Sequence, residues 1–193
     1  MNKLKIWFLK SWSTVLLFSI FIVLLVSPDT KAWLMRQIIS TVLLNKKIKK
    51  KKTEPGIIES LSIRDDNGKL TNTSELKGKV VFINFWASWC PPCRAEFPSI
   101  QKFYEKYKEN KDLVFLTINL DDNVAAGKEY LNKEQFSVPF LVPDGYVPNV
   151  FFNGSLPTTV VLDKSGNIRM HHAGMADYSN NSFYDEINLL LSE

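Results

Sequence analysis

The feature of this sequence that most constrains its fold is a pair of cysteines that follows an apolar run. The run covers residues 80–85, and the pair is Cys90 and Cys93, separated by two prolines. A nearly continuous apolar run of this length predicts a strand that is buried on both faces. Residues 94–108 then repeat apolar side chains at helical spacing. We therefore expect the cysteines to lie where a buried strand ends and a helix begins.

This cysteine pair predicts chemistry rather than architecture. The chain of 193 residues has no other cysteine, and two cysteines three positions apart close almost no loop. A helix start has unpaired backbone N–H groups and a positive dipole end, which together stabilise a thiolate. We expect Cys90 to attack a disulfide of a partner and Cys93 to resolve the mixed disulfide. Pro91 and Pro92 suit a first helical turn and stiffen the spacing between the thiols.

Hydrophobic periodicity and turn residues predict the other elements of the domain. They are a hairpin (57–63 and 69–73), a buried strand (113–120), a helix (124–136), a second hairpin (158–162 and 168–172) and a final helix (182–191). This order predicts an α/β fold with a mixed central β-sheet and flanking helices, preceded by an N-terminal β-hairpin. We place this domain at residues 53–193.

The N-terminal segment predicts a membrane anchor over residues 1–28. Residues 11–28 carry no charge, and eighteen residues of helix span roughly 27 Å, close to the hydrocarbon thickness of a bilayer. A cleaved signal peptide is the alternative, but residues 30–32 form only a poor cleavage site. Lys and Arg are slightly more numerous before the apolar run than after it, which favours a catalytic domain outside the cytoplasmic membrane.

Residues 29–52 form the predicted connection between anchor and domain. Apolar side chains recur at helical spacing over residues 31–44, which predicts an amphipathic helix that lies on the membrane or packs on the domain or on the anchor. Residues 46–52 contain six lysines and predict a solvated linker, with attraction to anionic lipid as the alternative. Residues 1–52 carry a net charge of +10 and residues 53–193 a net charge of −6. The acidic domain argues against nucleic-acid binding.

The residues around the cysteine pair resemble a known family. The stretch from Asn84 to Pro98, Asn-Phe-Trp-Ala-Ser-Trp-Cys-Pro-Pro-Cys-Arg-Ala-Glu-Phe-Pro, is similar to thioredoxin-like proteins of the TlpA/ResA/DsbE type. The resemblance extends over residues 57–191 and includes a second motif, Leu-Pro-Thr-Thr at 156–159. It implies a thioredoxin-like fold and a cis proline at Pro157, opposite the cysteines. We expect the partner's polypeptide to contact the surroundings of the pair, formed by Trp89, Pro91, Pro92, Leu156 and Pro157.

A glutamate near the pair is the third candidate catalytic residue. Classical thioredoxins carry a buried acid six residues before the first cysteine, whereas this chain has Asn84 there. Glu96 lies one helical turn after Cys93, and the resemblance implies that it helps to manage the proton of Cys93. An ordinary surface glutamate early in a helix is the alternative interpretation.

The resemblance also implies a reductase of extracytoplasmic protein disulfides, in cytochrome c maturation or in redox homeostasis of the cell envelope. Its partners would be protein disulfides and a membrane-embedded thiol donor, and we expect no cofactor. Two alternatives share the fold. A copper-delivery protein would use a downstream histidine such as His171 or His172, and a thiol peroxidase would need a hydroxyl where Ala87 stands. A zinc site lacks a second pair of ligands, so we expect no bound metal.

Overall fold

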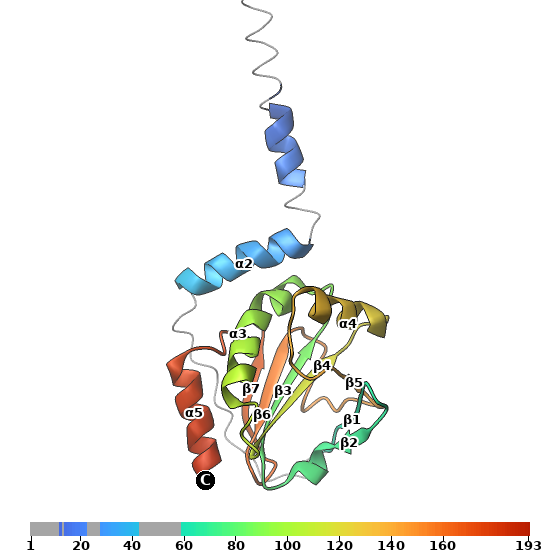
Figure 1. Cartoon of the computed structure of the whole chain (residues 1–193), viewed down its shortest axis with the longest axis vertical. Helices are drawn as coiled ribbons and strands as arrows, with labels where there is room; N and C mark the ends of the chain where they lie inside the picture. The colour runs from blue at the N-terminus through green and yellow to red at the C-terminus, as the bar shows by residue number, and fades with distance from the viewer. Residues whose placement is uncertain (1–11, 13, 23–27, 43–58) are drawn as a thin grey trace, which may run out of the picture.

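The computed structural model describes residues 12, 14–22, 28–42 and 59–193 of the chain (Figure 1). Within these ranges, no helix is long and apolar enough to cross a membrane. The predicted anchor falls largely on residues outside the described ranges, and it stays a prediction. The lysine-rich segment 46–52 also lies outside the described residues.

A seven-stranded mixed sheet forms the centre of the domain, in the order β2-β1-β5-β4-β3-β6-β7. Its central strand β3 pairs in parallel with β4 and antiparallel with β6. The predicted N-terminal hairpin extends this sheet, because β1 pairs with both β2 and β5. The strands are β1 (Ser62–Asp65), β2 (Leu70–Asn72), β3 (Val80–Trp86), β4 (Leu113–Asn119), β5 (Leu141–Pro143), β6 (Thr158–Leu162) and β7 (Ile168–Ala173).

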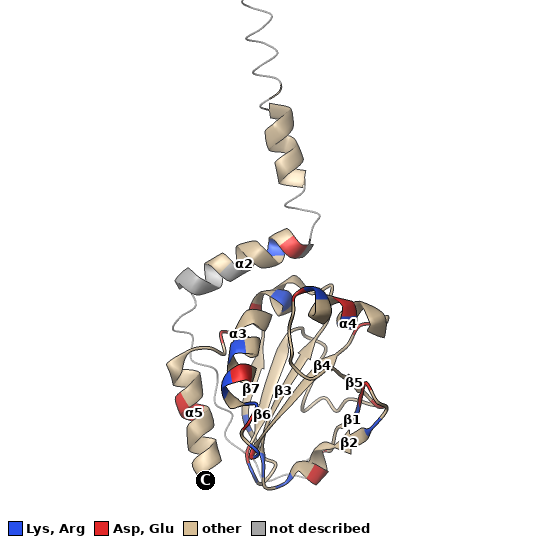
Figure 2. Ribbon diagram, viewed as in Figure 1, with Lys and Arg blue, Asp and Glu red and all other residues tan. Residues whose placement is uncertain are grey.

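The two faces of the sheet bury two different clusters of side chains. One cluster joins β3 to apolar residues of α3 (Pro91–Tyr107), α4 (Val124–Lys133) and α5 (Asn181–Ser192). The other lies on the opposite face of the sheet, where it includes Leu61 and Phe151 from segments outside the helices and strands. Strands β3, β4 and β6 contain no charged residue, and Figure 2 shows the charges on helices and turns around them. Burial of both faces explains why these strands read as apolar runs.

Most predicted elements are present, with shifted ends. The first strand begins at Ser62 rather than at residue 57. Just before it, Leu61 packs into the core, and its backbone N–H and carbonyl form hydrogen bonds with Thr73. Helix α4 ends at Lys133, three residues before the predicted end, and Gln135 adopts a positive φ of 58° just beyond it. The sequence did not predict β5 or the short 3₁₀ helix η1 (Thr73–Leu76).

The predicted amphipathic helix is present as α2 (Pro28–Val42), and it packs on α3. Ala32 is almost fully buried, whereas Trp33 and Leu34 are exposed. At its N-terminal end Asp29 forms an ion pair with Arg94, in the first turns of α3. Among the arrangements that the sequence left open, the structure has the helix packed on the domain.

Candidate active site

The cysteine pair lies at the predicted junction of strand and helix. All seven residues of β3 are buried, and the chain leaves the strand through a short loop closed by a hydrogen bond from Cys90 N–H to the Ala87 carbonyl (3.2 Å). Cys90 is the N-cap of α3, and its sulfur accepts the N–H of Cys93 at 3.3 Å. The two cysteines form a disulfide. A sulfur at this position receives the unpaired N–H groups and the positive dipole end of the helix.

The two cysteines differ in their access to a partner. Cys93 is fully buried, and Cys90 keeps a small exposed surface of 3%. Trp89, directly before Cys90, is 63% exposed and therefore offers an aromatic surface beside the disulfide. Pro91 and Pro92 occupy the first turn of α3 and are partly buried.

A second loop reaches the same end of the sheet. The peptide bond between Leu156 and Pro157 is cis, as the resemblance implied for this proline. Thr158, the next residue, pairs with Phe85 of β3. The register therefore places Pro157 at the end of the sheet where β3 delivers the cysteines. Leu156 is partly buried and Pro157 is buried.

Glu96 is buried beneath the cysteine pair. Its side chain is 1% exposed and lies one turn after Cys93 on α3. One carboxyl oxygen accepts the Asn84 amide N–H at 2.8 Å, and the other accepts the Ala176 backbone N–H at 3.2 Å. Burial raises the pKa of Glu96 to about 8, although the two hydrogen bonds act in the opposite direction. The surface-glutamate alternative is therefore excluded by the structure.

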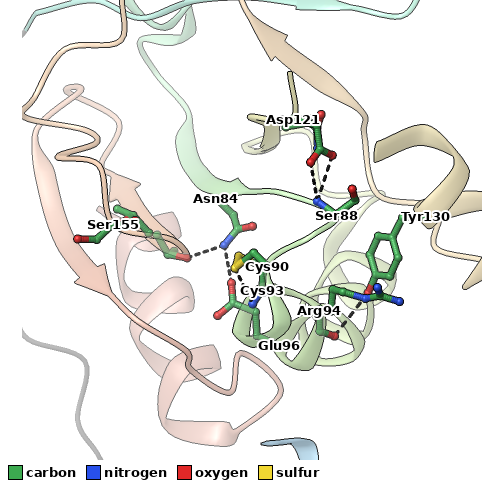
Figure 3. Close-up of a disulfide and its surroundings, with 12 residues drawn as sticks. Asn84, Ser88, Cys90, Cys93, Arg94, Glu96, Asp121, Tyr130 and Ser155 are labelled. Carbon is green, nitrogen blue, oxygen red and sulfur yellow. Dashed lines mark hydrogen bonds between the residues drawn. A yellow bond between two sulfur atoms is a disulfide. The ribbon is translucent and has the colours of Figure 1, made fainter. Parts of the chain in front are cut away.

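Asn84 connects Glu96 to Thr159 on the neighbouring strand β6 (Figure 3). Its amide nitrogen also donates to Thr159 Oγ1 at 2.9 Å, and the Tyr178 hydroxyl donates to the same oxygen at 2.7 Å. All four side chains are buried. Asn84 was indicated by the sequence only as the replacement of a buried acid, and no sequence signal pointed to roles for Thr159 or Tyr178.

The loop before the cysteines is held by a side chain from another strand end. Asp121, just after β4, accepts the Ser88 backbone N–H with both carboxylate oxygens, each at 3.0 Å. Asn119 donates to the same carboxylate at 2.8 Å. Asp121 directly follows a predicted strand, which is the one sequence signal that could have indicated this role.

Fold, disulfide and buried carboxyl together define a thioredoxin-like redox protein. The sequence matches the Redoxin family model over residues 45–186. It is 35% identical over 107 residues to the thiol-disulfide oxidoreductase ResA of Bacillus thuringiensis, an alignment that covers 55% of this chain and 61% of that protein. With ResA of Halalkalibacterium halodurans it shares 30% identity over 127 residues, covering 65% of this chain and 72% of the relative.

A solved structure shows the same architecture. The Chlorobium tepidum protein provisionally named thiol:disulfide interchange protein DsbE superposes with a TM-score of 0.60 at 25% identity, covering 75% of this chain and 99% of that one. The chain therefore belongs to the Redoxin family, among thioredoxin-like proteins of the TlpA/ResA/DsbE type. Its relatives are named thiol-disulfide oxidoreductases, and its fold fits an oxidoreductase.

Proposed function

We propose that this chain is a thiol–disulfide oxidoreductase that reduces protein disulfides outside the cytoplasmic membrane. The observation that carries the proposal is the Cys90–Cys93 disulfide at the start of α3, with Glu96 buried one turn behind it. The relatives named ResA support the same chemistry.

The reaction begins with the reduced pair. The Cys90 thiolate attacks a partner disulfide, forming a bond between Cys90 and one partner sulfur while the other partner sulfur leaves and takes up a proton. Cys93 then attacks Cys90, which closes the disulfide and releases the second partner sulfur as a thiol. Two electrons pass from the dithiol to the partner, and a membrane-embedded thiol donor restores them.

Glu96 and the exposed rim have separate roles in this proposal. Cys93 must lose its proton before it attacks, and Glu96 is the buried base that lies one helical turn away. Trp89, Pro91, Pro92, Leu156 and Pro157 form the surface that receives the partner's polypeptide. The resemblance to the TlpA/ResA/DsbE type points to cytochrome c maturation or envelope redox homeostasis as the setting.

The decisive measurement is the reduction potential of the Cys90–Cys93 pair, obtained by equilibration with glutathione or dithiothreitol buffers. A reductase should have a potential nearer to about −270 mV, the value of thioredoxin, than to about −120 mV, the value of the oxidant DsbA. A potential close to that of DsbA would reverse the proposed direction of electron flow.

The proposed location has its own test. Residues 1–28 would anchor the chain with the catalytic domain on the extracytoplasmic side. Membrane fractionation should recover the full chain with the membranes. Protease added to cells with a permeabilised outer barrier and an intact cytoplasmic membrane should digest the domain. A soluble mature product, or complete protection of the domain, would contradict this topology.

A further inference from the structure

One buried atom of the active site has no hydrogen-bond partner within the described residues. It is the side-chain oxygen of Asn84, whose residue is fully buried. A buried acceptor without a partner is uncommon and costs free energy. The nitrogen of the same amide is fully used, because its two hydrogens go to Glu96 and Thr159. The amide therefore has one satisfied end and one unsatisfied end in the disulfide form of the protein.

Asn84 is related to the cysteines through its partner Glu96. Cys93 lies one turn before Glu96 on α3, and Glu96 accepts the Asn84 amide N–H (Figure 3). A disulfide has no proton to donate, whereas reduction gives Cys93 an S–H group, which is a donor. Reduction therefore creates, one helical turn from Glu96, a donor that the disulfide form lacks.

An amide has almost the same shape after a half-turn that exchanges its oxygen and nitrogen. In the observed orientation the N–H groups face a Glu96 that accepts, which leaves the oxygen to accept an S–H if the reduced Cys93 presents one. After the half-turn the oxygen accepts an O–H from protonated Glu96, and an N–H faces the Cys93 sulfur, as a thiolate requires. The hydroxyl of Thr159 serves both orientations, because it can accept from the nitrogen or donate to the oxygen.

We propose that Asn84 is a positioning residue that couples the proton of Cys93 to Glu96 by turning its side-chain amide. One proton moves from the Cys93 sulfur to a Glu96 oxygen, and the total charge of the site is unchanged. Each arrangement leaves the Asn84 amide paired at both ends. The inference rests on the proposed exchange of a proton between Glu96 and Cys93.

Other titratable groups that face this site must be separated from the effect. Tyr178 stays protonated, because burial, and after it the charge of Glu96, raises the pKa of Tyr178 well above its usual value. His172 on β7 pairs in register with Thr159, and its ring nitrogen lies 3.5 Å from the Met175 carbonyl oxygen. The cysteines themselves titrate only when reduced. A substitution of His172 is therefore a necessary control.

The test is a double-mutant cycle on Glu96 and Asn84, read as the rate of disulfide exchange with a protein substrate between about pH 5 and pH 9. Glu96→Gln should slow exchange at neutral pH about tenfold or more in the wild-type background. In the Asn84→Leu background, which has a side chain of similar size without an amide, the same change should cost less than twofold. The rate profile of Asn84→Leu should also lose the inflection near pH 8.

Matched variants guard against a purely structural effect. Two control variants should preserve the full Glu96→Gln effect. They are His172→Gln and Thr117→Val, and Thr117 is the residue of β4 that pairs with Asn84. Thr159→Val should reduce the Glu96→Gln effect. This variant replaces Asn84→Leu in the test if circular dichroism shows that Asn84→Leu does not fold. Equal Glu96→Gln effects in the wild-type, Asn84→Leu and Thr159→Val backgrounds would overturn the coupling alone. No Glu96→Gln effect in the wild type would overturn the role of Glu96 and the coupling with it.

Discussion

Asp121 binds the backbone N–H of Ser88 with both of its carboxylate oxygens, although the two residues are 33 positions apart. The bond connects the end of β4 to the loop that carries Trp89 and Cys90. Asn119 orients the carboxylate, and the Asn119 side chain fills the space where a Cβ on Gly127 of α4 would lie, 2.6 to 2.8 Å from its atoms. The loop before the cysteines is therefore positioned through a contact with α4.

Gly127→Ala should destabilise the domain, although alanine usually favours a helix over glycine by up to about 1 kcal/mol. The new methyl group would displace Asn119 and loosen Asp121, at a net cost of about 1–3 kcal/mol. Denaturant unfolding measures the loss, and hydrogen exchange at Ser88 reports the loop. Ala125→Ser, at an exposed position of the same helix, is the control. A more stable Gly127→Ala protein would show that Asn119 relaxes without cost.

Cys93→Ser should accumulate mixed disulfides between Cys90 and its substrates, because the resolving thiol is absent. Cys90→Ser should accumulate none, since Cys93 is fully buried. Non-reducing electrophoresis followed by mass spectrometry of the trapped peptide distinguishes the two. Trapping through Cys93 in the Cys90→Ser protein would reverse the assignment of attacking and resolving cysteines.

Glu96→Gln should change how stability depends on pH. Burial raises the pKa of Glu96 from 4.5 to about 8, so the folded state binds this proton more tightly than the unfolded state does. The wild type should therefore lose stability as the pH rises from about 4.5 to about 8, by on the order of 5 kcal/mol. Glu96→Gln should lack this decline, as urea midpoints across the range would reveal. Parallel wild-type and variant curves would mean that Glu96 titrates normally.

Asp29→Ala should release α2 from the active-site helix. Arg94 is nearly buried and stacks over the Tyr130 ring at 4.6 Å, so the loss of its ion-pair partner should cost about 1–3 kcal/mol. Hydrogen exchange should increase in α2 and in the first turn of α3. Lys133→Ala removes only the exposed 3.5 Å contact to the same carboxylate and should have a smaller effect. Equal exchange in wild type and Asp29→Ala would show that other contacts hold α2.

The sequence predicted those elements that are indicated by a pattern within a short stretch of residues. The apolar runs identified β3 and β4, and the spacing of Cys90, Cys93 and Glu96 on one helix followed from helical geometry. It could not show that Glu96 is buried, because Ala176, which binds the Glu96 carboxyl, and Thr159, which binds the Asn84 amide, lie far along the chain. Strand β5 was missed because three residues carry no periodicity, and it pairs with strands from distant parts of the chain.

Glu96 and Asn84 both bind residues that lie far along the chain, and this distance affects the order in which the active site forms during synthesis. The carboxyl pairs with Ala176, 80 residues later, and Asn84 pairs with Thr159, 75 residues later. Closing such long loops is slow and occurs only after the later residues have been made. In a growing chain, both cysteines are therefore exposed to water well before Glu96 becomes buried. The cysteines acquire the environment set by the buried Glu96 only when the last third of the domain folds.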